Sequence, residues 1–158
     1  MRKSLVEEIL KQMETNKNIF FICSDLGYKL FDRIRDTYPD RFVNTGASEF
    51  SAVGIAVGLA IEGKIPFVYS ITPFLLYRAF EMIRNYIDHE IIPVKLLGGG
   101  RDQDYHIDGW SHDSSDAKQI MKTFKNIKTY WPYTSEEIPA LLAEIIDNNK
   151  PCFVSLRK

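Results

Sequence analysis

The sequence predicts an α/β fold of three layers, α/β/α, in which helices cover both faces of a mostly parallel sheet. Short runs that are apolar throughout, such as residues 19–23 and 152–156, indicate strands buried on both faces. Amphipathic segments with helical spacing separate these runs, as is typical of parallel sheets. With 158 residues, 45% of them hydrophobic, the chain can bury one substantial core, so we expect a single domain over residues 1–158.

The expected elements alternate regularly along the chain. Leu5, Ile9 and Met13 recur at helical spacing, and a polar turn at residues 16–18 separates this helix from the strand at 19–23. Further strands are expected at 42–43, 65–69, 94–97, 127–130 and 152–156, and further helices at 30–38, 48–61, 74–88, 115–124 and 135–147. The longest irregular stretch is residues 98–113, rich in glycine and aspartate.

In sheets of this type, ligands bind beyond the carboxyl ends of the strands. We therefore expect the loops after residues 43, 69 and 97 to border any site. No Gly-x-Gly-x-x-Gly follows an expected strand, and residues 98–101 lead into a polar loop rather than a helix. A flavodoxin-like nucleotide-binding module is therefore a weak alternative.

The composition disfavours several classes of partner. Twenty basic and 21 acidic side chains leave a formal net charge of -1, so no broad field favours nucleic acid or an anionic membrane. Cys23 and Cys152 lie in separate apolar runs, which favours reduced core thiols over a disulfide or a metal site. The first eight residues carry charges where a signal peptide needs an apolar block, and no uncharged run is long enough to cross a bilayer. We expect a soluble, cytoplasmic protein.

Glu49 is the residue that most needs an explanation. It is the one carboxylate of an otherwise apolar helix at residues 48–61, whose small residues permit close packing. Capping and the helix dipole alone explain an acid in a first turn. Gly54 and Gly58 are likewise explained by contacts between helix and sheet.

The segments around Glu49 favour another explanation. Residues 44–49 are similar to the Gly-Ile-Ala-Glu-Gln turn of transketolase and its relatives, and residues 53–60 to the Val-Gly-x-Ala-x-Gly-Leu-Ala helix that follows. Residues 63–67 and 74–84 are similar to the family's Gly-x-x-Pro-Phe strand and Phe-x-x-Arg-Arg-Ala-Tyr-Asp-Gln-Ile-Arg helix.

Two more segments complete the pattern. Ile92-Pro-Val-Lys95 is similar to Leu-Pro-Val-Lys, and residues 108–112 resemble Asp-Gly-Pro-Thr-His. Each motif is weak alone, but the ordered set identifies the chain as a member of the pyrimidine-binding domains of transketolase-like thiamine diphosphate enzymes.

This resemblance implies roles toward the cofactor. Glu49 would hydrogen-bond N1' of the aminopyrimidine and make the reactive imino tautomer of the 4'-amino group accessible. Phe74 and Tyr77 align with aromatics that contact this ring, and Ile71 stands where many transketolases have a stacking phenylalanine. Phe74 and Tyr77 are also explained as core residues at helical spacing. Asp25, with Leu26, resembles an Asp-Leu pair near the cofactor at the family's subunit interface.

The resemblance also implies substrate residues. His112 aligns with a histidine that contacts the hydroxyls of the donor sugar, and we count it among the catalytic residues. Asp108 aligns with an aspartate that recognises the stereochemistry of this sugar. The alternative explanation for both is a polar loop leading to a helix, with cap-type side chains at residues 113–116, and an isolated histidine would favour it. Positions that grip phosphate in transketolases are altered, although Lys29 or Arg101 can hold a phosphate as point charges. The donor can therefore be non-phosphorylated or nucleotide-linked.

The family's Gly-Asp-Gly segment, which holds Mg²⁺ and the diphosphate through oxygen ligands, is missing from the sequence. Residues 156–158 end the sequence where the pyrimidine-side domain would end. We therefore expect no metal ligands here and a split enzyme: a larger subunit would carry the Mg²⁺ and diphosphate domain in an α2β2 assembly, and the third domain would be absent from this chain.

The leading interpretation is a subunit that transfers a two-carbon ketol unit between sugars or sugar derivatives. One alternative is a decarboxylating carboligase similar to deoxyxylulose phosphate synthase. The other is a non-catalytic regulatory paralogue, which the joint presence of Glu49, Asp108 and His112 disfavours.

Overall fold

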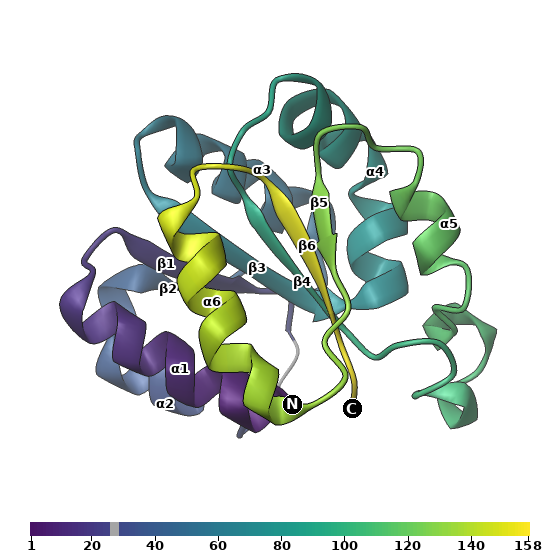
Figure 1. Cartoon of the computed structure of the whole chain (residues 1–158), viewed down its shortest axis with the longest axis horizontal. Helices are drawn as coiled ribbons and strands as arrows, with labels where there is room; N and C mark the ends of the chain where they lie inside the picture. Colours follow the sequence, from purple (N-terminus) through teal and green to yellow (C-terminus); the bar gives the residue numbers. More distant parts are fainter. Residues whose placement is uncertain (26–28) are drawn as a thin grey trace.

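The computed structural model describes residues 1–25 and 29–158. It confirms the α/β class: six strands form one sheet in the order β2-β1-β3-β4-β6-β5, and all of its strand pairings are parallel (Figure 1). The strands are β1 Ile19–Cys23, β2 Phe42–Asn44, β3 Ile65–Ile71, β4 Lys95–Gly99, β5 Lys128–Tyr130 and β6 Cys152–Leu156.

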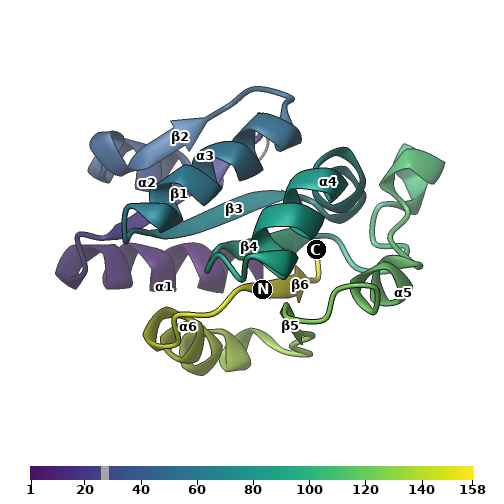
Figure 2. The same cartoon turned by 90° about the horizontal axis from the view of Figure 1, so that it is seen from above.

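Helices cover both faces of this sheet. They are α1 Arg2–Thr15, α2 Asp32–Thr37, α3 Glu49–Ile61, α4 Phe80–Met82, α5 Ala117–Met121 and α6 Ile138–Asp147. The view from above places α1 and α6 on one side of the sheet and α3 and α4 on the other (Figure 2). The three layers expected from the sequence are therefore present.

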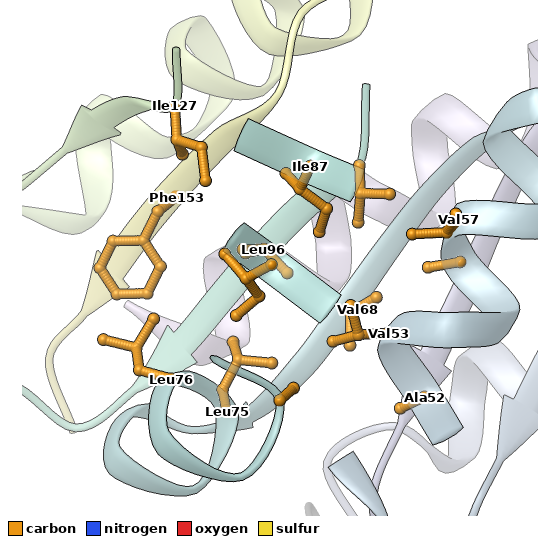
Figure 3. Close-up of a cluster of buried hydrophobic side chains, with 14 of the residues drawn as sticks. Ala52, Val53, Val57, Val68, Leu75, Leu76, Ile87, Leu96, Ile127 and Phe153 are labelled. Atoms are coloured by element: carbon orange, nitrogen blue, oxygen red, sulfur yellow. The ribbon is translucent and has the colours of Figure 1, made fainter. Parts of the chain in front are cut away.

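Each face of the sheet carries its own hydrophobic cluster. On the α3 face, Val53 of α3 packs with Val68, Leu96 and Phe153 from three neighbouring strands (Figure 3). On the opposite face, residues of α1, α2 and α6 pack on the other sides of the same strands. Because successive strand residues point to opposite faces, each apolar run supplies both clusters. This explains why the strands are apolar throughout rather than alternating.

Several helices differ from their expected form. The helix expected at 74–88 has π-type hydrogen bonding over Phe74–Arg78 and Ile83–His89, on either side of the short α4. Spacing patterns that assume 3.6 residues per turn cannot reveal this change. The helix expected at 135–147 begins as a 3₁₀ turn, where Thr134 and Glu137 form a capping box.

Chain order places the site within the sheet. Because β1 lies between β2 and β3, the strand order reverses at this point, and such a switch is where open parallel sheets bind ligands. The register pairs Cys23 with both Asn44 and Tyr69, so the three strands end close together. The carboxyl ends of β1, β2 and β3 consequently lie at one edge of the sheet.

Both cysteines lie in the core, as the apolar runs around them predict. Cys23 and Cys152 are buried as reduced thiols, in β1 and β6. Among the helices formed by the described residues, none is long and apolar enough to cross a membrane.

Candidate active site around Glu49

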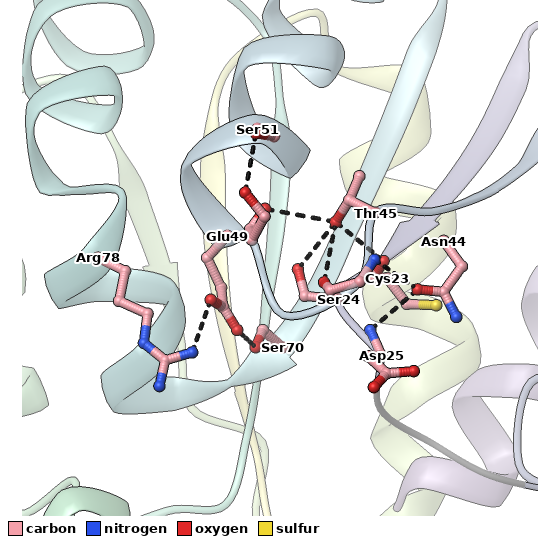
Figure 4. Close-up of polar contacts among 11 residues, drawn as sticks. Cys23, Ser24, Asp25, Asn44, Thr45, Glu49, Ser51, Ser70 and Arg78 are labelled. Carbon is pink, nitrogen blue, oxygen red and sulfur yellow. Dashed lines mark hydrogen bonds and ion pairs between the residues drawn. The ribbon is translucent and has the colours of Figure 1, made fainter.

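Glu49 is the first residue of α3, and its side chain is 1% exposed. The Ser70 hydroxyl donates a 2.8 Å hydrogen bond to one carboxylate oxygen, and the Arg78 guanidinium lies 2.9 Å from the other (Figure 4). A buried carboxylate is tolerated only when such partners compensate for its lost hydration. The two partners come from the end of β3 and from the π-helical segment after it.

The turn before Glu49 is fixed to the end of β1. Asn44 accepts hydrogen bonds from the backbone amides of Asp25 and Gly46, at 3.0 and 2.9 Å. Gly46 has φ +67°, a left-handed conformation that glycine adopts without steric cost. Thr45 adds hydroxyl contacts to carbonyl oxygens on both sides of the turn, including that of Cys23. The backbone therefore holds the start of α3 in one orientation.

Arg78 connects Glu49 to an aromatic pair. Its guanidinium lies over the Phe74 ring, 4.0 Å from the centroid. The Phe74 ring meets His112 edge to face at a centroid separation of 4.8 Å, and Ser111 Oγ lies 3.0 Å from His112 Nδ1. Glu49, Phe74 and His112, from the loops after β2, β3 and β4, are thus brought into one contiguous group.

Gly109 shapes the loop that presents His112. It separates two 3₁₀ turns, His106–Asp108 and Trp110–His112, and has φ +87° with ψ -178°. This combination is open almost only to glycine. Asp108 is exposed at the end of the first turn, so the structure places it on the same loop as His112.

The other residues expected to bind the cofactor differ in exposure and in their hydrogen-bond partners. Tyr77 is 43% exposed, and its hydroxyl donates to the Asp116 carboxylate at the start of α5. Burial of the hydroxyl and this carboxylate raise the pKa of Tyr77. Ile71 is half-buried and ends β3. Asp25 is exposed with φ +46°, and its expected companion Leu26 lies outside the described residues.

Lys29 and Arg101 were expected to bind a phosphate group of the substrate. Lys29 is exposed and has φ +62°. Arg101 is 3% exposed, and its guanidinium donates to the Ser155 hydroxyl at 3.1 Å and also to the Ser155 carbonyl. Its charge lies near the face of Trp131, and burial lowers the pKa of Arg101. The setting of Arg101 inside the fold therefore opposes the substrate role expected for it.

Neither Ser70 nor Arg78 was predicted from the sequence to have a role in the site. Ser70 is a polar residue inside the apolar strand β3, fully buried, and that polarity was a usable signal. Arg78 lies four residues after Phe74, a spacing that brings side chains together on a helix. Neither signal identifies Glu49 as the partner, because that contact depends on the tertiary fold.

The chemistry of this group fits an aminopyrimidine. A buried carboxylate can hydrogen-bond a ring nitrogen, and an aromatic face beside it can stack on a flat heterocycle. Within residues 1–25 and 29–158, no three His, Cys, Asp or Glu side chains are grouped so that they could hold a metal ion.

Comparison with known proteins agrees with this chemistry. The family described as "Transketolase, pyrimidine binding domain" matches residues 1–158. The chain belongs to this family. A subunit of 6-deoxy-6-sulfo-D-fructose transketolase from Clostridium sp. (strain MSTE9) is 26% identical over 157 residues, which cover 99% of this chain and 49% of that protein.

Two further comparisons also give transketolases. A subunit of the apulose-4-phosphate transketolase from Actinobacillus succinogenes is 33% identical over 119 residues, 75% of this chain and 38% of that protein. A solved structure of a split gene transketolase, described as an inactive beta4 tetramer, superposes with a TM-score of 0.86 at 25% identity, covering 99% of this chain and 50% of that one. The chain thus spans about half the length of these relatives or less.

Proposed function

We propose that this chain is the pyrimidine-binding part of a transketolase-like transferase that moves a two-carbon ketol unit between sugars or sugar derivatives. The observation that carries the proposal is the Glu49 carboxylate, 1% exposed and paired with Ser70 and Arg78, beside the aromatic ring of Phe74. A plain capping residue has no need of burial, because capping oxygens usually lie at the surface.

Each side chain has a task in this proposal. Glu49 accepts or shares a hydrogen with the ring nitrogen N1', and Ser70 fixes the orientation of the carboxylate through its 2.8 Å hydrogen bond. Phe74 provides an apolar face for the ring. His112, in contact with Phe74, faces the same region and binds hydroxyls of the donor sugar. When bound, thiamine diphosphate supplies the reactive carbon centre of the transfer.

The remaining parts of the enzyme are proposed from the relatives. Related chains are named as transketolase subunits, and this chain spans about half of their length or less. A larger chain would hold Mg²⁺ and the diphosphate through oxygen ligands, and two copies of each would form an α2β2 assembly in the cytoplasm. Under this arrangement, the cofactor lies between the two kinds of chain.

Glu49→Gln tests the proposal. Glutamine preserves the side-chain shape but cannot donate or take up a proton at neutral pH, so transferase activity of the assembled enzyme should fall by about 10²-fold or more. Glu62→Gln, at the exposed carboxyl end of the same helix, is the matched control and should retain activity. Light scattering should show that both variants assemble. Full activity of Glu49→Gln would exclude the proposed chemistry.

Substrate choice requires a second assay. The assembled enzyme should be assayed with phosphorylated and unphosphorylated ketoses and an aldose acceptor. Both kinds of donor are needed because Arg101, which was expected to bind a phosphate, is buried. A strict requirement for pyruvate, with release of CO₂, would instead assign a carboligase.

A further inference from the structure

Arg78 engages both surfaces that the proposed function reserves for the aminopyrimidine. Its guanidinium is planar, donates to the Glu49 carboxylate at 2.9 Å, and lies 4.0 Å over the centre of the Phe74 ring. A flat ring that stacks on Phe74 and hydrogen-bonds Glu49 needs the same two contacts. One planar group can satisfy them at a time.

We propose that Arg78 competes with the aminopyrimidine for Glu49 and Phe74, and therefore sets how tightly the enzyme holds thiamine diphosphate. This inference rests on the proposed function. Arg78 acts as a positioning residue: it keeps the buried carboxylate paired and oriented until the ring replaces it. The hydrogen bond from Ser70 to the other carboxylate oxygen of Glu49 is kept during this exchange, so the carboxylate always has a partner.

The unequal burial of the pair makes such an exchange feasible. The Glu49 side chain is 1% exposed, whereas that of Arg78 is 47% exposed. The guanidinium can therefore rotate into solvent with a small change in its hydration free energy, since it is already about half exposed. Glu49 cannot follow, because it would have to leave the start of α3. Arg78 is thus the member of the pair that moves.

A second arrangement makes the opposite prediction. If Arg78 stayed on Glu49 while the ring was bound, it would support the complex, and its removal would weaken cofactor binding. Under competition, Arg78 pairs with Glu49 only in the enzyme without bound cofactor. Removing Arg78 therefore destabilises that state alone, and cofactor binding becomes tighter. The sign of the change in Kd therefore separates the two arrangements.

The experiment uses this chain assembled with its diphosphate-binding subunit, titrated with thiamine diphosphate and Mg²⁺ in a calorimeter. Arg78→Met should lower the Kd for thiamine diphosphate by about tenfold and raise the association rate. Arg78→Lys should fall between this variant and the unmodified enzyme, because an ammonium pairs with Glu49 but cannot stack as a plane. Arg84→Met is the control and should leave the Kd unchanged, because Arg84 makes an exposed hydrogen bond to the Asn85 side chain in the next π-helical segment.

The outcomes distinguish this inference from the proposed function. An unmodified assembly that binds no thiamine diphosphate would overturn both. An assembly that binds it, with an Arg78→Met Kd that is unchanged or higher, would overturn the competition alone. If Arg78→Met fails to assemble, Arg78→Lys decides: a Kd equal to or above that of the unmodified enzyme contradicts the inference, and a lower Kd supports it.

Discussion

Two charged side chains are buried at opposite ends of the sheet, and their partners are of different kinds. Glu49, at the carboxyl ends of the strands, is held by the side chains of Ser70 and Arg78. Lys95 begins β4 at the amino end, and its ammonium donates to the backbone carbonyls of Asn148 and Lys150, at 2.8 and 2.6 Å. Side-chain partners can be exchanged by a rotamer change, whereas backbone partners cannot.

The difference separates a structural charge from a functional one. Lys95 is 1% exposed, and burial lowers its pKa. Its bonds tie the loop between α6 and β6 to the sheet, so the charge contributes to one fixed structure. The partners of Glu49 leave one of its oxygens facing a half-exposed arginine. A buried charge with an exchangeable partner is the arrangement that a ligand can use.

Lys95→Met is the change that should most affect this comparison. Methionine has a side chain of similar length but leaves two carbonyl oxygens without a donor, which should lower the free energy of unfolding by about 2–4 kcal/mol. Urea unfolding of the chain measures this loss. The matched control is Lys128→Met, which removes an exposed ion pair with Glu144 and should cost less than about 1 kcal/mol. Equal losses in the two variants would contradict the structural role of Lys95.

Gly98→Ala tests how tightly the carboxyl end of β4 is packed. A Cβ atom at this position would lie 2.6 Å from Thr72 Oγ1 and 2.8 Å from the Phe153 ring, so the free energy of unfolding should fall by about 1–3 kcal/mol. In Gly58→Ala, the added Cβ meets nothing within 4 Å on α3, and alanine favours the helix by roughly 0.5–1 kcal/mol. Thermal unfolding should therefore shift in opposite directions for the two variants.

Alkaline pH should weaken the fold through two buried groups, Cys152 and Tyr69. Burial raises the pKa of Cys152 from 9.0 to about 12 and that of Tyr69 from 10.0 to about 12. The folded state keeps these protons when the unfolded state has lost them, so stability falls from pH 9 toward pH 12. Each group contributes a slope of up to about 1.4 kcal/mol per pH unit. The lowered pKa of Lys95 makes stability rise with pH below pH 10.5. This single group opposes the combined effect of Cys152 and Tyr69.

Cys152→Ala isolates this effect. Its stability at neutral pH should be lower because of the smaller side chain, but its decline between pH 9 and pH 12 should be shallower than that of the unmodified chain. Parallel declines in urea midpoints would show that Cys152 does not titrate as expected.

Tyr77→Phe should give the smallest effect. It removes the hydroxyl that joins the π-helical segment to Asp116, a bond between two side chains near the surface, and should cost about 0.5–1 kcal/mol. The loss should be independent of thiamine diphosphate if Tyr77 only joins these elements. A change in cofactor Kd larger than the change in stability would assign Tyr77 to the cofactor site.

Local signals allowed most of the fold to be predicted from the sequence. Most strands lie in apolar runs bounded by polar turns, and the six strands of the described residues were located to within about two residues. The helical stretch after β3 was placed correctly, but its π-type hydrogen bonding was missed, because apolar spacing does not report the bonding pattern. The two 3₁₀ turns around Gly109 were missed because such short turns have no periodicity.

The site was predictable only where residue identity carries chemistry. Glu49 was conspicuous as a single acid in an apolar helix, and the structure places it in one group with Phe74 and His112. Arg101 shows the limit of this reasoning. Whether an arginine in a loop faces solvent or bonds a strand such as β6 is decided by three-dimensional packing, which the sequence of the loop does not contain.

The position of β6 between β4 and β5 has a consequence for biosynthesis. Among the strands of the described chain, β5 has β6 as its sole neighbour, yet β6 is made more than twenty residues later. Until β6 is made, the edge of β4 that it will cover is open, and its unpaired backbone groups can bond to other chains. This interval is when the newly made protein should depend most on chaperones.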